Sequence, residues 1–282
     1  MASFTEISVS QLNRLLGTPD CPVLIDLRID QDFDQDPRLI PGAYRQAFTD
    51  LAPLVERHQG DKLVVYCQKG LKISQGAAAI LRDAGLAAEV LEGGHVAWRD
   101  ANFPMIDSAK MPPRNEQGRT VWVTRHRPKI DRIACPWLIR RFIDPGAQFL
   151  FVSPGQVMNV AEKFKATPFD MEPIDGEDLF WSHRGTDCTF DTLIREFGLR
   201  SAALDRLAVI VRGADTDRHD LAPEAAGLMA ASLGLSRMHR DDLQQLDASM
   251  MLYDAFYRWA RDAQGEKHDW PPAGKTGQGN KN

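Results

Sequence analysis

The segment over residues 64–74 constrains the fold most, because it places a cysteine between a buried strand and a helix. An apolar, β-favouring run ends at Cys67, a short loop containing Gly70 follows, and residues 75–81 have helical character. In such an arrangement, backbone N–H groups and the helix N-terminus surround the sulfur with partial positive charge. They favour the thiolate, which is the reactive form of cysteine. The alternative is a buried structural cysteine, the commoner role of a lone Cys.

Four segments in the same order resemble the rhodanese-like sulfurtransferases over about the first 105 residues. Besides the Cys67 loop, they are VLIDLR at 23–28, LIPGA at 39–43 and GGHVAW at 93–98. Leu39 stands where the family usually has a histidine, which is a scaffold position. The resemblance implies that Cys67 is the catalytic nucleophile. It also implies a substrate-binding loop that consists of Gln68, Lys69, Gly70, Leu71 and Lys72. A pair of residues, Asp26 and Arg28, would support that loop.

Loop length separates sulfur chemistry from phosphate chemistry. The related dual-specificity phosphatases have Cys-x5-Arg, in which the arginine clamps phosphate with two hydrogen bonds. Here Lys72 lies five residues beyond Cys67 and Ile73 comes next, so the arginine is missing. We therefore expect sulfur chemistry. Lys69 resembles the lysine of thiosulfate-using members and would pair with a sulfonate, unless it is an ordinary surface lysine.

The first half predicts an α/β domain. Strand-like runs over residues 23–27, 62–66 and 88–91 alternate with amphipathic helical segments. This alternation is typical of a parallel sheet with helices on both faces. Cys67 would then lie at the carboxyl edge of that sheet, where open α/β sheets bind ligands.

A change of composition near the middle predicts two domains, for which 282 residues suffice. Residues 107–118 are polar and contain two consecutive prolines, which cannot continue a helix. We expect residues 1–106 to form the rhodanese-like domain, 107–118 a linker, and 119–263 a second, mostly helical α/β or α+β domain. The tail over residues 264–282, rich in Gly, Lys, Asn and Pro, is expected to be disordered.

Four segments of the second half resemble the carboxy-terminal domain shared by bacterial chromate-resistance proteins, over about residues 120–262. They are residues 125–144, 180–190, 209–215 and 252–257. The resemblance implies a setting in chromate resistance, but it brings no established reaction.

His183, Cys188 and Asp215 are candidate metal ligands, because all three fall at the ends of runs that resemble strands. Imidazole and thiolate suit zinc, iron or copper better than magnesium. They predict a transition-metal site in the second domain. The alternative is structural: a hydrogen-bonded histidine, a small core cysteine and a loop-capping aspartate. No cofactor is expected in the first domain.

Charge and cysteine usage exclude several classes of protein. A net charge of -5 argues against a general binder of nucleic acid or anionic membranes. The N-terminal residues do not resemble a signal peptide, and no apolar run approaches the roughly 20 residues that span a bilayer. Four widely spaced cysteines indicate neither a disulfide framework nor a Cys-x-x-Cys zinc site. We expect a cytoplasmic protein with reduced thiols and without nucleic-acid or membrane partners.

The expected function is sulfur transfer. Cys67 would take the outer sulfur of a donor such as thiosulfate, hold it as a persulfide and pass it to a thiol acceptor. Joined to the second domain, this chemistry would act on chromate or on chromium–thiol adducts. The competing hypothesis is a sensor or binding protein, in which Cys67 captures an oxyanion or oxidant once, without turnover.

Overall fold

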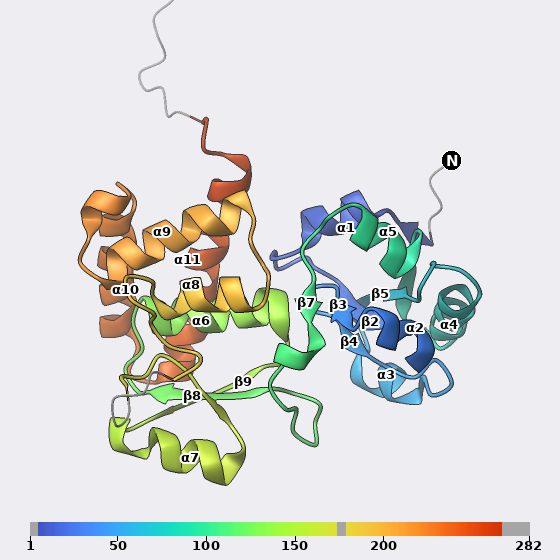
Figure 1. The fold of residues 1–282 in the computed structure, drawn as a ribbon, viewed down its shortest axis with the longest axis horizontal. Helices are drawn as coiled ribbons and strands as arrows, with labels where there is room; N and C mark the ends of the chain where they lie inside the picture. Colours follow the sequence, from blue (N-terminus) through green and yellow to red (C-terminus); the bar gives the residue numbers. More distant parts are fainter. Residues whose placement is uncertain (1–4, 174–178, 267–282) are drawn as a thin grey trace, which may run out of the picture.

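The computed structural model describes residues 5–173 and 179–266. They form two lobes side by side, each built around its own parallel sheet (Figure 1). The elements of the first lobe are β1 (Glu6–Ile7), α1 (Val9–Leu15), β2 (Val23–Asp26), α2 (Asp30–Gln35), β3 (Arg38–Leu39), β4 (Tyr44–Arg45), α3 (Ala52–Arg57), β5 (Lys62–Tyr66), α4 (Lys72–Asp83), β6 (Ala87–Leu91), α5 (Gly94–Asp100) and β7 (Ile106–Asp107).

The first sheet has five strands in the order β1-β6-β5-β2-β4, and all its pairs are parallel. Alternate side chains of β5 supply the cores on its two faces. Val65 packs in the cluster that contains residues of α3 and α4, whereas Val64 and Tyr66 pack in the cluster with residues of α1 and α5. The predicted parallel sheet with helices on both faces is therefore confirmed.

The second lobe is mostly helical, as predicted. Its elements are β8 (Val121–Arg125), α6 (Asp131–Leu138), a π-helical turn (Ile139–Ile143), β9 (Gln148–Val152), α7 (Val157–Phe164), β10 (Thr167–Pro168), α8 (Thr189–Glu196), α9 (Ala202–Asp215), α10 (Ala225–Met238) and α11 (Asp242–Asp262), with short 3-10 turns at Pro154–Gln156 and His219–Leu221.

A three-stranded parallel sheet, β10-β8-β9, separates α7 from the other helices of this lobe (Figure 1). Val121 and Val123 of β8 pack with Val157 of α7 on one face. Trp122 points to the other face, into the large core that α6, α8, α9 and α11 share. Because all three strands are parallel, the loops that follow β8 and β10 meet at one edge of the sheet.

The strand-like reading of residues 209–211 is wrong, because they lie inside α9. The helix begins at a cap in which the Ser201 hydroxyl accepts a hydrogen bond from the N–H of Leu204. Ile210 and Val211 are fully buried against neighbouring helices. Tertiary packing therefore outweighs the β-propensity of a branched run. Asp215 ends a helix rather than a strand.

The predicted linker makes ordered contacts at the junction of the lobes. β7 pairs antiparallel with β3, so Arg38 lies opposite Asp107. Met105 belongs to a core cluster of the first lobe, whereas Ile106, the next residue, belongs to the core of the second. Whether each lobe folds alone stays a prediction. Most of the predicted disordered tail, residues 267–282, lies outside the described residues.

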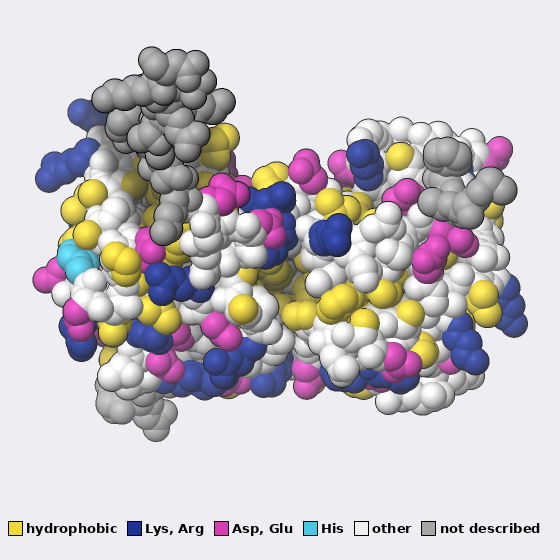
Figure 2. All heavy atoms as spheres, turned by 90° about the horizontal axis from the view of Figure 1, so that it is seen from above, with side chains coloured by type: hydrophobic (Ala, Val, Ile, Leu, Met, Phe, Trp, Pro, Cys, Tyr) yellow, Lys and Arg dark blue, Asp and Glu magenta, His cyan; other side chains and the backbone are white. Residues whose placement is uncertain are grey.

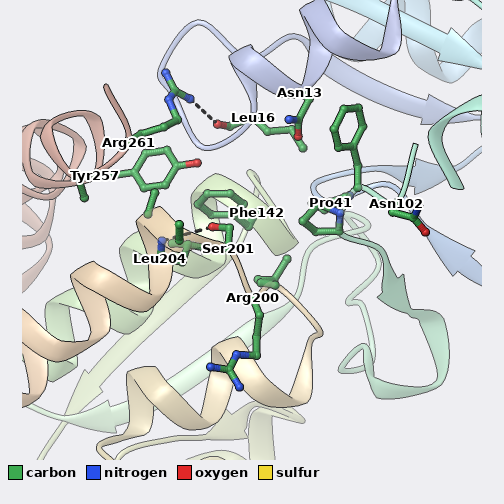
Figure 3. Close-up of a pocket in the computed structure, with 16 residues that line it drawn as sticks. Asn13, Leu16, Pro41, Asn102, Phe142, Arg200, Ser201, Leu204, Tyr257 and Arg261 are labelled. Atoms are coloured by element: carbon green, nitrogen blue, oxygen red, sulfur yellow. Dashed lines mark hydrogen bonds between the residues drawn. The ribbon is translucent and has the colours of Figure 1, made fainter. Parts of the chain in front are cut away.

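A cavity of about 380 Å³ lies at the junction of the lobes (Figure 3). Pro41 and Phe103 line it from the first lobe and Phe142 and Tyr257 from the second. Seen from above, apolar side chains also gather at the waist between the lobes (Figure 2). Arg261 of α11 crosses the junction and donates a hydrogen bond of 2.9 Å to the carbonyl oxygen of Arg14.

Candidate functional site

Cys67 lies directly after β5, at the carboxyl edge of the first sheet, and the loop that follows ends where α4 begins at Lys72. The cysteine is 6% exposed. Its Sγ lies 3.2 Å from the hydroxyl oxygen of Ser74, in the first turn of α4. The sulfur is thus held at the N-terminus of a helix, as the sequence predicted, and a hydroxyl accompanies it.

The N-terminus of α5 fixes the backbone of the Cys67 loop. The N–H of His95 donates to the carbonyl oxygen of Cys67 at 3.0 Å, and the N–H of Val96 donates to that of Gln68 at 3.1 Å. In a trans peptide the carbonyl and the next N–H point in opposite directions. Holding the Gln68 carbonyl toward α5 therefore turns the N–H of Lys69 away from that helix, toward the sulfur.

Two glycines allow this close approach of backbones. Gly70 has a φ of 67°, and a Cβ there would lie 2.5 Å from the carbonyl oxygen of Leu91. Gly94 has a φ of 59°, and a Cβ there would overlap the Cys67 carbonyl and come within 2.5 Å of the Gly70 nitrogen. The GG segment of the sequence thus packs directly against the backbone of the Cys67 loop.

The surroundings of Cys67 favour its thiolate. Burial by itself raises the pKa of the thiol. The Ser74 hydroxyl and the backbone N–H groups of Ser74, Lys69 and Leu71 act in the opposite direction and bring the pKa below its ordinary value of 9.0. These donors stabilise the anion because charge-assisted hydrogen bonds are stronger than neutral ones.

The other three cysteines have the opposite tendency. Burial raises the pKa of Cys21 to about 12 and raises the pKa values of Cys135 and Cys188 well above the ordinary value. All four are free thiols. Cys67 is therefore the one cysteine of the chain whose environment activates it.

Asp26 and Arg28 form a fully buried ion pair beside the end of β5, with a shortest distance of 2.6 Å. The same guanidinium donates to the carbonyl oxygens of Asp36 and Arg38, each at 2.8 Å. The pair therefore ties β2 to the segment that enters β3. This geometry is that of a brace, and the loop-supporting role of the two residues stays a prediction.

The predicted substrate-binding side chains line the outer side of the loop. Lys69, Leu71 and Lys72 are exposed, and Gln68 is half-buried. Within residues 5–173 and 179–266, neither lysine has an ion-pair partner. Both ammonium groups are therefore free to face an anionic donor, and their binding role stays a prediction.

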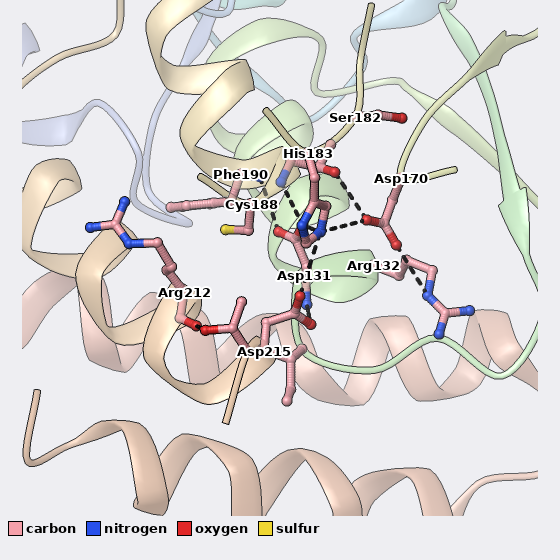
Figure 4. A network of polar contacts seen from close by, with 12 residues as sticks. Asp131, Arg132, Asp170, Ser182, His183, Cys188, Phe190, Arg212 and Asp215 are labelled. Atoms are coloured by element: carbon pink, nitrogen blue, oxygen red, sulfur yellow. Dashed lines mark hydrogen bonds and ion pairs between the residues drawn. The ribbon is translucent and has the colours of Figure 1, made fainter. Parts of the chain in front are cut away.

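The structure brings together two of the three predicted metal ligands. His183 Nε2 lies 3.6 Å from a carboxylate oxygen of Asp215 and 3.4 Å from one of Asp131 (Figure 4). Among the described residues, these three form a group whose donor atoms all lie within 4.8 Å of one another. Cys188 does not belong to this group. Its Sγ is buried and lies 3.1 Å from a carboxylate oxygen of Asp191, in the first turn of α8.

The carboxylate–histidine cluster, meaning Asp131, Asp170, His183 and Asp215, is held by surrounding groups. Asp170 approaches His183 Nε2 at 3.2 Å. Hydrogen bonding to Asp131 and Asp170 raises the pKa of His183 to about 10. Burial, together with those two carboxylates, raises the pKa of Asp215 to about 7. The cluster thus places three carboxylates beside one imidazole.

Several residues of these sites were missed from the sequence. Ser74 could have been found from its place in the first turn of the helix after the loop. Asp131 lies in the first turn of α6, where acidic residues are common, so its position alone did not single it out. Asp170 follows β10, a strand of two residues that no hydrophobic period reveals.

Comparisons with known proteins divide the chain in two. A model of the rhodanese-like domain matches residues 8–101, and a model of the ChrB C-terminal domain matches residues 122–260. Protein ChrB of Cupriavidus metallidurans is 34% identical over 178 residues, which cover 62% of this chain and 50% of that protein. An uncharacterized protein of Synechocystis is 31% identical over 117 residues, 40% of this chain and 64% of that protein. The chain thus spans about half to two thirds of these relatives.

Two solved structures are similar to somewhat more than a third of the chain. A rhodanese-related protein from Thermoplasma volcanium is 19% identical, with a TM-score of 0.32, over 36% of this chain and 98% of that one. A thiosulfate sulfurtransferase from Pseudomonas aeruginosa is 26% identical, with a TM-score of 0.32, over 38% of this chain and 20% of that one.

Among the described residues, none of the helices combines the length and the apolar character needed to cross a bilayer.

Proposed function

The chain joins a rhodanese-like domain to a ChrB C-terminal domain, and from this premise we propose that Cys67 carries sulfur as a persulfide. The observation that supports it most directly is the loop itself. It lowers the pKa of one nearly buried thiol while the surroundings of the other three cysteines raise theirs. A thiolate with several converging N–H donors is suited to attack sulfur and to hold a second sulfur atom afterwards.

The reaction has two displacement steps. The Cys67 thiolate attacks the outer sulfur of thiosulfate, the S–S bond breaks, and sulfite leaves with the bonding electron pair. A nucleophile such as cyanide or a thiolate then attacks the outer sulfur of the persulfide and restores the Cys67 thiolate. Negative charge stays at the loop throughout, where the N–H groups and Ser74 stabilise it. Lys69 and Lys72 orient the anionic donor.

The setting we propose is chromate resistance, in which sulfur passed to a thiol acceptor serves the handling of chromate or of chromium–thiol adducts. This step rests on similarity of the second domain to the ChrB C-terminal domain. A reducing compartment such as the cytoplasm suits a free thiolate of this kind.

Thiocyanate formation from thiosulfate and cyanide tests the proposal. Cys67→Ser should abolish it, because the hydroxyl is a poor nucleophile without a base, whereas Cys21→Ser and Cys135→Ser should retain it. Wild-type turnover in Cys67→Ser would refute the mechanism. Intact-mass analysis after mixing with thiosulfate should show one added sulfur, with chromate as the parallel sample. A modification by chromate that occurs once, with no thiocyanate turnover, would favour a sensor instead.

A further inference from the structure

The second lobe gathers four potential ligands at one point, although they come from distant parts of the sequence. Asp131 begins α6 after β8, Asp170 follows β10, and Asp215 ends α9. His183 reaches this point from the loop before α8, and Figure 4 shows its imidazole among the carboxylates. β8 and β10 are adjacent parallel strands, so the cluster lies beyond the carboxyl edge of the second sheet. Ligand sites in open parallel sheets form at this edge.

The arginines near the cluster lie at one of its carboxylates only. Arg125 and Arg132 both approach Asp170, each at 3.4 Å. Within the described part of the chain, Asp131 and Asp215 have no lysine or arginine partner, and their one ionic contact is His183. Asp131 is only 1% exposed. A buried carboxylate normally requires a nearby positive charge, and here Asp131 and Asp215 share the single imidazole of His183.

The separations of the donor atoms match those around a metal ion. Metal–nitrogen and metal–oxygen bonds of about 2.1 Å place tetrahedral ligands about 3.4 Å apart. The Nε2 atom of His183 lies 3.4 Å from Asp131 and 3.6 Å from Asp215. An ordinary ion pair would need only one such contact. Here three carboxylates approach the same Nε2, the third at 3.2 Å. The donor atoms of Asp131, His183 and Asp215 all lie within 4.8 Å of one another, close enough for one ion to contact all three.

Outer contacts orient the donors, as they do in metal sites. The carboxylate of Asp131 accepts hydrogen bonds from the N–H groups of Thr189 and Phe190, at 2.8 and 3.0 Å. The Thr189 hydroxyl donates to Asp170 at 2.9 Å. The backbone before Asp131 is also fixed, because Tyr253 of α11 donates to the carbonyl oxygen of Ile130 at 2.8 Å. Ile130 has a φ of 34°, which a branched residue rarely adopts.

We propose that Asp131, His183 and Asp215 bind one divalent transition-metal ion, with Asp170 as an adjacent carboxylate that neutralises and orients it. One imidazole with carboxylates, and without the thiolate of Cys188, suits Mn²⁺, Fe²⁺ or Zn²⁺ better than copper(I). The His183 side chain is 40% exposed, so water reaches the site and occupies the remaining coordination positions. This inference is independent of sulfur transfer at Cys67.

The test is metal content of the full-length protein after dialysis against Zn²⁺ or Mn²⁺ and then against metal-free buffer. Mn²⁺ is included because thiolates bind it poorly, so the cysteines do not mimic the site. The wild type should retain about one metal per chain, and His183→Ala and Asp215→Asn should each weaken binding by about 100-fold. Asp131 is left unchanged in the test, because its carboxylate also holds the start of α8.

Matched controls come from the same stretch of chain. Asp217 and His219 form a more exposed pair at 3.6 Å, so Asp217→Asn and His219→Ala remove the same chemical groups outside the cluster. Both controls, together with Cys188→Ser and Cys67→Ser, should bind metal as the wild type does. Urea unfolding of His183→Ala checks that the fold is intact. Substoichiometric metal in the wild type, or equal binding in the His183 and Asp215 variants, would overturn the proposal and leave His183 as an ion-paired imidazolium.

Discussion

Replacing Ser74 with alanine isolates the contribution of one hydroxyl to the Cys67 thiolate. Ser74 is fully buried, and its oxygen lies 3.2 Å from the sulfur and 3.3 Å from the carbonyl oxygen of Leu71. Alanine removes only this oxygen and is a better helix former, so the fold should be retained. The variant therefore changes the stabilisation of the anion with little change elsewhere.

The size of the effect follows from competition for the hydroxyl proton. A hydrogen bond to a charged group contributes about 1.5–3 kcal/mol, and the neutral bond to the Leu71 carbonyl that it displaces contributes about 0.5–1.5 kcal/mol. The midpoints of these two ranges differ by about 1.3 kcal/mol, which is the expected net stabilisation of the thiolate and equals about one pKa unit. We expect the pKa of Cys67 to rise by about one unit in Ser74→Ala.

The assay is alkylation of the Cys67 peptide by iodoacetamide across a pH series, followed by mass spectrometry. The midpoint should move up by about one unit. Below both midpoints the rate should fall only about threefold, because a thiolate of higher pKa is more nucleophilic and offsets part of the tenfold loss of anion. Gln75→Ala, at the exposed next position, is the control. Coincident midpoints for the two variants would show that the hydroxyl does not stabilise the anion.

Three further outcomes are expected. Gly94→Ala should lower the free energy of unfolding in urea by about 3 kcal/mol or more, because the added Cβ would overlap backbone atoms of the Cys67 loop. Gly85→Ala is the control: Gly85 also has a positive φ, but nothing lies within 4 Å of the added Cβ, so the loss should be only about 1–2 kcal/mol. Equal losses in the two variants would contradict the close approach of Gly94 to the loop. Tyr253→Phe should cost about 1–2 kcal/mol in the same assay through its buried hydrogen bond, and a neutral result would argue against that bond. Limited proteolysis should cut first within residues 107–118 or in the tail, and early cleavage within residues 60–100 would contradict the proposed domain boundary.

The first lobe could be predicted closely because its signals are local. The run that ends at Tyr66 forms β5 with the predicted bounds, and the cysteine after it lies where the pattern places it. Ser74 was not singled out, since a serine in a first helical turn is common. Its role depends on the conformation of the loop, which places the Cys67 sulfur beside the first turn of α4.

The second lobe was predicted less well because its contacts join distant segments. His183 and Asp215 were chosen from donor chemistry, and the structure does place them together. Cys188 was chosen on the same grounds, yet the turn into α8 directs its sulfur to Asp191 instead. Asp170 could not be found, because it depends on a two-residue strand that pairs with β8 across 45 positions of sequence.

The pairing of β3 with β7 changes how the two lobes can communicate. A flexible tether would give one lobe a millimolar effective concentration near the other and let their surfaces meet by diffusion. Here the brace from Arg28 holds the Arg38 carbonyl at the start of β3, and the adjoining strand leads directly into the core of the second lobe. This pairing is therefore expected to hold Cys67 and the carboxylate–histidine cluster at one separation. Direct transfer of a bound group between the two sites therefore cannot rely on a swinging linker.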